Sequence, residues 1–262
     1  MITLSQVSCF LRGQSCLHEV SLSFTSGLVA LIGANGAGKS TLLHLLADGG
    51  RHYPSAKITG SLELEGQALR TFPSQALAQR RAFLPQQHSE QLPLAVHDIV
   101  MLACWPFMQP SQTAALHADA LQRWDLEHLA HRSWQALSGG ERQRVQLART
   151  WLQLQFQTQA SQRIWLLDEP QNALDLPHQQ SLKKQLHEEA RQGALVVFST
   201  HDINFALHNA DRVIALGNGQ ILADGNAQEL ADPALLQHIF GVPFEALTPP
   251  ESEKPWLVPR SL

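Results

Sequence analysis

Eight consecutive residues near the N-terminus have the composition and spacing of a phosphate-binding loop. They lie between an apolar run, Leu28 to Ile32, and a helix whose leucines form an apolar face suited to covering a sheet. Glycines let the backbone fold so that successive N–H groups point inward, at the positive end of the following helix. Lys39 is placed to meet the β- and γ-phosphates of a nucleoside triphosphate, and Ser40 to hold Mg²⁺. The sequence therefore predicts nucleoside triphosphate binding, with a glycine-rich turn carrying a stray lysine as the alternative. The loop consists of Gly33, Ala34, Asn35, Gly36, Ala37, Gly38, Lys39 and Ser40.

Two carboxylates and a histidine follow short apolar runs further along the chain. Asp168 and Glu169 come directly after Ile164 to Leu167, and His201 comes after Leu195 to Ser199. Continuous apolar runs of this length are typical of buried parallel strands. Ligands bind at the carboxyl ends of such strands in α/β sheets. The sequence therefore predicts that these three side chains lie at a ligand-binding edge.

The pentapeptide Leu137-Ser138-Gly139-Gly140-Glu141 precedes a helical segment with regularly spaced apolar residues. Ser138 with Glu141 three residues later fits a capping box, which by itself is a purely structural device. The pentapeptide gains a functional meaning only from the motifs around it.

Length and composition limit the classes of function. The chain has 262 residues, of which 44% are hydrophobic, so it can bury a substantial core without disulfides. The net charge is −4 and there is no block of like charges, which argues against binding to nucleic acid or to an anionic membrane surface. The apolar runs are too short to span a membrane and no signal peptide is visible, so we expect a cytosolic chain whose membrane role runs through a protein partner.

The order of predicted elements favours an α/β fold. Alternating segments in residues 2–32 predict strands packed on one face, and those in 58–66 predict a small antiparallel flap. Residues 74–135 read as mainly helical. Two βα units follow, with strands at 164–167 and 195–199. The proline-rich residues 241–262 predict an irregular tail.

Taken in order, these motifs resemble the ATP-binding cassette (ABC) ATPase family over residues 1 to about 240. The resemblance implies an α/β fold with a RecA-like P-loop NTPase core and an antiparallel β-subdomain. It also implies an inserted helical subdomain at about residues 88–150. A single phosphate loop indicates a single cassette.

The resemblance also implies a role for each matching residue. Glu169 would be the general base, and His201 would contact the γ-phosphate and orient that base. Gln86, in Leu84-Pro85-Gln86-Gln87, matches the glutamine that senses Mg²⁺ and water, with Gln87 as a competing candidate. Mg²⁺ ligands would be Ser40, Gln86 and Asp168. ATP-binding residues would be Gly33, Ala34, Asn35, Gly36, Ala37, Gly38, Lys39, Ser40, Thr41, Phe10, Ser138, Gly139, Gly140 and Asp175.

The adenine-binding residue and the dimer seam also follow from the resemblance. The family usually has an aromatic residue that stacks on adenine near position 10, and this chain has no tyrosine at that point. Phe10 is the nearest aromatic residue. The alternative is that Phe10 is an ordinary core phenylalanine. In the family, the segment Ser138 to Gly140 of one protomer faces the γ-phosphate held by the loop of a second copy, and Asp175 would lie at that dimer seam. Two copies would therefore sandwich two ATP molecules.

A single cassette without a transmembrane segment is similar to importer ATPase subunits that dock on a separate integral membrane permease dimer. The implied location is the cytoplasmic face of the bacterial inner membrane, with a periplasmic substrate-binding protein as an indirect partner and no nucleic acid. Segments 75–82, 137–149 and 200–204 resemble the type II importers of heme, iron-siderophores and cobalamin. The spacer from Trp151 to Gln162 resembles that of heme and cobalamin ATPases more than that of most siderophore ones. We expect heme as the cargo, with cobalamin or ferric siderophore as alternatives. The sequence also leaves open a soluble non-transport ABC ATPase, an ATP-holding module without hydrolysis and an exporter subunit.

Overall fold

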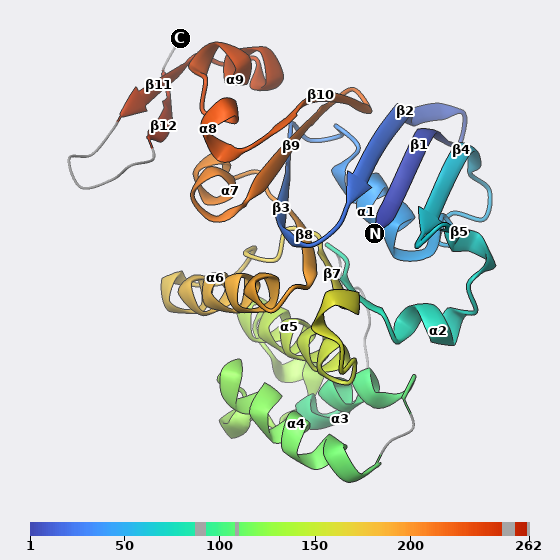
Figure 1. Ribbon diagram of the computed structural model, residues 1–262. Coiled ribbons are helices and arrows are strands. Elements are labelled where there is room, and N and C mark those ends of the chain that lie inside the picture. The colour runs from blue at the N-terminus through green and yellow to red at the C-terminus, as the bar shows by residue number, and fades with distance from the viewer. Residues whose placement is uncertain (87–92, 108–109, 248–254, 261–262) are drawn as a thin grey trace. The chain divides into compact units, whose positions relative to one another are not determined.

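The chain divides into two units (Figure 1). Unit 1 comprises Met1–Thr71 and Val197–Leu262, and unit 2 comprises Phe72–Val196. The computed structural model describes residues 1–86, 93–107, 110–247 and 255–260. The boundary falls within strand β8, Leu195–Ser199, which therefore contributes residues to both units.

An antiparallel sheet forms the N-terminal part of unit 1, with strand order β2-β1-β4-β5. Alternation in β2 produces its burial pattern, because Val20, Leu22 and Phe24 are buried and the intervening Ser21 and Ser23 are exposed. Strands β1 and β2 confirm the strands predicted in residues 2–32, and the antiparallel pairing of β4 confirms the flap predicted at residues 58–66. The strands are β1 (Ile2–Leu11), β2 (Gln14–Phe24), β4 (Lys57–Leu64) and β5 (Gln67–Ala68).

A second sheet runs through the rest of unit 1 in the order β10-β9-β3-β8. Strand β3 (Gly27–Ile32) pairs in parallel with β9 (Arg212–Gly217), and β10 (Gln220–Gly225) pairs with β9 in antiparallel fashion. Helix α1 (Lys39–Asp48) follows β3 and buries its leucine face, as the sequence predicted. The remaining helical segments of unit 1 are η1 (Leu69–Thr71), α7 (Ile203–Asn209), α8 (Ala227–Leu230) and α9 (Pro233–Phe240).

The C-terminal segment contains two strands where the sequence predicts an irregular tail. Strand β11 (Phe244–Leu247) pairs antiparallel with β12 (Trp256–Pro259). The Asn204 side chain in α7 donates to the Leu257 carbonyl at 2.9 Å and accepts from the Leu257 N–H at 2.8 Å. Leu257 is buried, so the pairing is fixed by a contact 53 residues away that local composition does not reveal.

The sheet of unit 2 has the order β8-β7-β6. All four residues of β7 (Ile164–Leu167) are buried, as are those of β8, which confirms the two predicted buried strands. Strand β6 (Arg81–Leu84) pairs in parallel with β7, so the mainly helical prediction for residues 74–135 is wrong there. Its four residues are identified as a strand by pairing with β7 rather than by their own pattern.

Helix α5 (Gly139–Gln155) is the central helix of unit 2, with α3 (Val96–Met101) and α4 (Pro110–Arg123) packed against it. Figure 1 shows these three side by side. A helical insertion with boundaries at about 88 and 150 stays a prediction. Within the described part of the chain, no helix combines the length and apolar character needed to cross a membrane. The other helical segments are α2 (Ser74–Ala78), η2 (Leu102–Cys104), η3 (Glu127–Leu129), η4 (Trp134–Ala136), η5 (Ala160–Gln162) and α6 (Leu176–Arg191).

Candidate nucleotide site

The predicted phosphate loop connects β3 to α1 in unit 1. Strand β3 is buried from Leu28 to Ile32, so its apolar side chains fix where the loop begins. Gly33 has a φ of 143°, and a Cβ on it would lie 2.1 Å from the Leu216 carbonyl oxygen. Only glycine fits there, because backbone occupies the space a side chain would need. The loop therefore leaves the strand in close backbone contact with β9.

Lys39 lies folded over the start of this loop. Its ammonium donates to the carbonyl oxygens of Gly33 at 2.8 Å and Ala34 at 3.1 Å. The residue is 6% exposed, so its charge is held in a largely buried position at the first turn of α1. A buried cation at a helix N-terminus is a favourable environment for a phosphate group.

His201 lies at the same edge of the sheet as the phosphate loop. The N–H of Thr200 donates to the Leu31 carbonyl of β3 at 3.1 Å, and the Thr200 hydroxyl accepts from the Asp202 N–H at 2.9 Å. Asp202 then caps α7 by accepting from the Phe205 N–H at 2.9 Å. His201 is thus held between an anchored threonine and a helix cap, and its side chain is exposed.

Phe10 lies in β1, opposite Ser15 of β2 and Lys57 of β4, and is partly buried. An adenine-stacking residue needs an exposed ring face, and a core residue needs burial. A partly buried ring meets neither condition fully, so both interpretations of Phe10 stay open.

In unit 2, the two predicted carboxylates follow β7. Asp168 is 2% exposed, and its N–H donates to the Leu84 carbonyl at 2.9 Å. Glu169 has a φ of 49°, which directs the chain sharply away from the strand. The Asn172 side-chain amide donates to the Glu169 carboxylate, and the Asn172 N–H donates to the Glu169 carbonyl at 3.1 Å. Asn172 therefore holds both the carboxylate and the backbone carbonyl of Glu169 in a tight turn.

Gln86 follows β6 at the edge of the sheet where Asp168 and Glu169 follow β7. Leu84 of β6 is the register partner of Leu167 of β7, so the segments that follow both strands leave the same edge. Gln86 is exposed, whereas Gln87 lies outside the described residues. The structure thus brings three predicted site residues together at the carboxyl ends of two neighbouring parallel strands: Gln86, Asp168 and Glu169.

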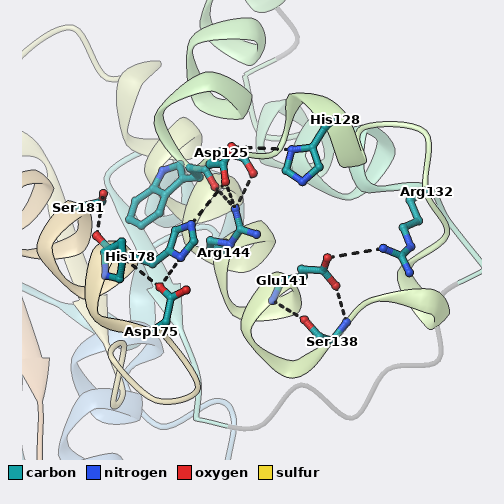
Figure 2. Close-up of polar contacts among 11 residues, drawn as sticks. Asp125, His128, Arg132, Ser138, Glu141, Arg144, Asp175, His178 and Ser181 are labelled. Atoms are coloured by element: carbon teal, nitrogen blue, oxygen red, sulfur yellow. Dashed lines mark hydrogen bonds and ion pairs between the residues drawn. The ribbon is translucent and has the colours of Figure 1, made fainter.

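Ser138 caps helix α5 as the sequence predicted (Figure 2). Its hydroxyl accepts from the Glu141 N–H at 3.3 Å, and its own N–H donates to the Glu141 carboxylate at 2.6 Å. The hydrogen bond from the Ser138 amide holds the pKa of Glu141 below its ordinary value, and Arg132 at 3.6 Å acts in the same direction. A Cβ on Gly140 would lie 2.7 Å from the Ala173 carbonyl, so the signature segment, Ser138 to Gly140, packs directly on the turn that leads to Asp175.

A cluster of charged residues lies next to this turn (Figure 2). Arg144 of α5 is buried and donates to the Trp124 carbonyl at 2.9 Å, and its guanidinium lies 3.2 Å from the Asp125 carboxylate. The imidazole of His178 lies between two carboxylates, with Nε2 3.6 Å from Asp125 and Nδ1 2.5 Å from Asp175. Hydrogen bonds from the His178 amide and imidazole lower the pKa of Asp175, which also caps α6.

A pocket of about 230 Å³ opens between the signature segment and this cluster. Its walls come from the N-terminal turns of α5 and α6 and from the segment between β7 and α6. The residues that line it are Ser138, Gly140, Glu141, Arg144, Ala173, Leu174, Asp175 and His178.

Sequence analysis did not identify four residues that contact the predicted site residues or one another. Asn172 contacts Glu169, and Asp125, Arg144 and His178 form the charged cluster next to Asp175. Asn172 lies three residues after Glu169, so a turn-forming side chain at that spacing was the available signal. The other three are separated by 19 to 53 residues in the chain, and no local pattern connects them.

The chain is similar in sequence to ABC transporter proteins along most of its length. A family model described as ABC transporter matches residues 17–172. The hemin import ATP-binding protein HmuV of Bordetella avium is 38% identical over 246 residues, which is 92% of each chain. The protein of the same name from Rhodopseudomonas palustris is 39% identical over 88% of this chain and 85% of its own. That of Photobacterium damselae subsp. damselae is 36% identical over 94% and 91%.

Two solved structures are similar along most of the chain. One is an ABC transporter of the metal-chelate type in an inward-facing conformation, with a TM-score of 0.77 and 26% identity over 99% of this chain and 97% of the other. The other is the dimeric ATP-binding cassette MJ0796 in a post-hydrolysis state bound to ADP and Pi, with a TM-score of 0.70 and 26% identity over 87% and 99%. These similarities confirm the predicted fold class.

Proposed function

Because the chain belongs to the ATP-binding cassette transporter family, we propose that it is the ATP-hydrolysing subunit of a bacterial importer that takes up heme through a separate permease. Family membership means that the chain binds ATP and couples its hydrolysis to transport. The identity of the cargo and the roles of individual residues are the parts that we add.

The observation that carries the proposal is the similarity to three hemin import ATP-binding proteins. Each is 36–39% identical to this chain, and each match covers at least 85% of both sequences. A match of this extent includes the regions outside the ATP-binding motifs. No residue in the described site reads the cargo chemically, so the assignment of heme depends on relatives rather than on the site.

We assign a role in ATP hydrolysis to each predicted site residue. The inward-pointing N–H groups of the loop and Lys39 would bind the phosphates. Glu169 would accept a proton from the water that attacks the γ-phosphorus, and the bond to the β–γ bridging oxygen would break to leave ADP and inorganic phosphate. The amide of Asn172 on Glu169 supports this role, since it fixes the orientation of the carboxylate. His201 would contact the γ-phosphate from its anchored position.

The donor atoms of the predicted metal ligands suit Mg²⁺. The Ser40 hydroxyl, the Asp168 carboxylate and the Gln86 amide oxygen are all oxygen donors, which this hard cation prefers. When bound with ATP, Mg²⁺ neutralises charge on the β- and γ-phosphate oxygens. Asp168 and Gln86 emerge at the same sheet edge, which supports a shared role.

The remaining motif residues support assembly with a second copy. Ser138 caps the N-terminus of α5, where an anion can bind. Gly139 and Gly140, the first two residues of the helix, have no side chains that would block an approaching anion. A similar cassette was solved as a dimer bound to ADP and Pi. We therefore propose a head-to-tail homodimer in which this segment meets the partner's γ-phosphate, with Asp175 at the seam. The dimer would sit on a permease pair at the cytoplasmic face of the inner membrane, and a periplasmic binding protein would deliver the cargo.

The test is reconstitution of the chain with the permease and binding protein encoded beside it. ATP-dependent uptake of labelled heme, cobalamin and ferric siderophore into lipid vesicles would be measured in parallel. The proposal predicts uptake of heme, lost in the Glu169→Gln variant while ATP binding is retained. Uptake of only another cargo would keep the motor and reject heme, and normal turnover by Glu169→Gln would reject the general base.

Import of a ferric siderophore or of cobalamin is the second candidate. It is favoured by the structural similarity to a transporter of the metal-chelate type, although at 26% identity this match is weaker than that to the hemin relatives. The same uptake assay separates the candidates.

A further inference from the structure

The hairpin between β9 and β10 turns through two residues, Asn218 and Gly219, close to the phosphate loop. Gly217 and Gln220 are register partners, so only these two residues form the turn. Both have positive φ, 50° for Asn218 and 76° for Gly219. An Asn-Gly pair is the preferred sequence for such turns, because both residues tolerate the left-handed region.

The backbone of Gly219 is hydrogen-bonded on two sides. Its N–H donates to the carbonyl oxygen of Ala37, a residue of the phosphate loop, at 3.1 Å. Its carbonyl oxygen accepts from the N–H of His18 in β2 at 2.8 Å. The turn therefore links the outer side of the phosphate loop to a strand of the antiparallel sheet.

Neighbouring backbone leaves no room for a side chain at Gly219 or at Gly38 of the phosphate loop. A Cβ on Gly219 would lie 2.8 Å from the Cys16 carbonyl oxygen and 3.1 Å from the Leu17 Cα. A Cβ on Gly38 of the loop would meet the same Cys16 oxygen at 2.7 Å and the Gly219 Cα at 3.6 Å. Three backbone segments are thus in contact: the phosphate loop, β2 and the hairpin turn.

We propose that Gly219 is a positioning residue for ATP binding, which acts by holding the phosphate loop against β2. It would touch no ATP atom itself. The N–H groups of the loop can point at phosphate oxygens only while the loop keeps its curvature, and the bond from Gly219 to Ala37 fixes its outer side. A side chain at Gly219 must displace either β2 or the turn, and displacement of the turn breaks that bond. The proposal rests on the nucleotide site assigned above.

The chain contains a matched control for this turn. Glu65 and Gly66 form the two-residue turn between β4 and β5, with φ of 53° and 78°, and Leu64 and Gln67 are register partners. A Cβ on Gly66 would meet nothing within 4 Å. Asparagine tolerates positive φ, so Gly219→Asn and Gly66→Asn carry similar backbone strain and differ in the steric contact.

ATP affinity of the full chain would be measured by calorimetry in EDTA, which prevents turnover, together with urea unfolding of each variant. Gly219→Asn should raise the Kd for ATP about tenfold, because small misplacements of binding groups have large effects. Gly66→Asn should leave the Kd within about twofold of wild type. In steady-state hydrolysis with Mg²⁺, Gly219→Asn should raise the KM for ATP more than it lowers kcat.

Equal ATP affinities of the two variants would overturn the positioning role of Gly219. Failure of the wild-type chain to bind ATP would instead overturn the nucleotide site. Should Gly219→Asn not fold, amide exchange of the wild type decides the question. ATP in EDTA should slow exchange in residues 217–220 as well as 33–40, with residues 65–67 unaffected, and protection of 33–40 alone would contradict the proposal.

Discussion

Glu189 in α6 accepts hydrogen bonds from three side chains, and its removal should be among the most destabilising single changes in unit 2. Its carboxylate lies 3.2 Å from the Arg163 guanidinium, and it accepts from the Trp151 indole at 3.0 Å and from Gln155 at 2.8 Å. The side chain of Glu189 is 2% exposed and that of Arg163 is 10% exposed. Arg163 immediately precedes β7, so the cluster joins α5 and α6 to the strand that Asp168 follows.

The expected loss of unfolding free energy in Glu189→Ala follows from the burial of this ion pair. Removing one partner of a buried ion pair costs about 3–5 kcal/mol, because the other charge is left without compensation. In the Glu189→Ala variant this charge is that of Arg163, and the Trp151 N–H loses its acceptor as well. Typical domains have an unfolding free energy of about 5–15 kcal/mol, so the loss is a large fraction of the total.

Urea unfolding followed by tryptophan fluorescence measures this loss. Five of the six tryptophans lie in unit 2, so the signal reports mainly on that unit. With a urea m-value of about 3 kcal/mol/M, the midpoint should fall by about 1–2 M. Replacing both partners with apolar residues, Arg163→Met with Glu189→Leu, should recover most of the stability.

An exposed pair in the same unit provides the control. Asp119 and Arg123 of α4 lie 2.9 Å apart with side chains 39% and 32% exposed, and Asp119→Ala should cost about 0.5 kcal/mol or less. If Glu189→Ala shifts the midpoint no more than Asp119→Ala does, the reasoning from burial is refuted.

Three further changes have defined outcomes. Lys39→Ala should weaken ATP binding itself, and an unchanged Kd by calorimetry would count against the phosphate loop. Burial, with His52 stacked on it, lowers the pKa of His44 from 6.5 to about 4, so the folded state binds the proton less readily than the unfolded state. Stability should therefore be complete above about pH 6.5 and fall by about 1–2 kcal/mol on acidification to about pH 4.5, after allowance for partial exposure. His44→Gln should flatten that part of the pH profile in urea titrations, and an unaltered slope would contradict the assignment. His178→Ala should accelerate amide hydrogen exchange in residues 172–178, because Asp175 loses its contact with the imidazole. Exchange identical to that of the wild type, measured by mass spectrometry, would show that this contact does not stabilise the segment.

Short-range features were predictable from the sequence because they depend on neighbouring residues. The phosphate loop is specified by glycine spacing next to an apolar strand, and the Ser138 cap by a partner three residues away. The buried strands β7 and β8 were predicted with their observed boundaries, since continuous apolar runs have few other stable environments.

Long-range features were decided only by the tertiary structure. The four residues of β6 become a strand through pairing with β7, and β12 is ordered by Asn204, which lies 53 residues before Leu257. Asp125, Arg144 and His178 meet because α5 and α6 bring them together, and Gly219 contacts the phosphate loop from a hairpin about 180 residues away. Sequence alone determined which residues could bind phosphate. The fold decided which backbone groups hold them in position, because such contacts depend on packing between segments and leave no periodic trace in the chain.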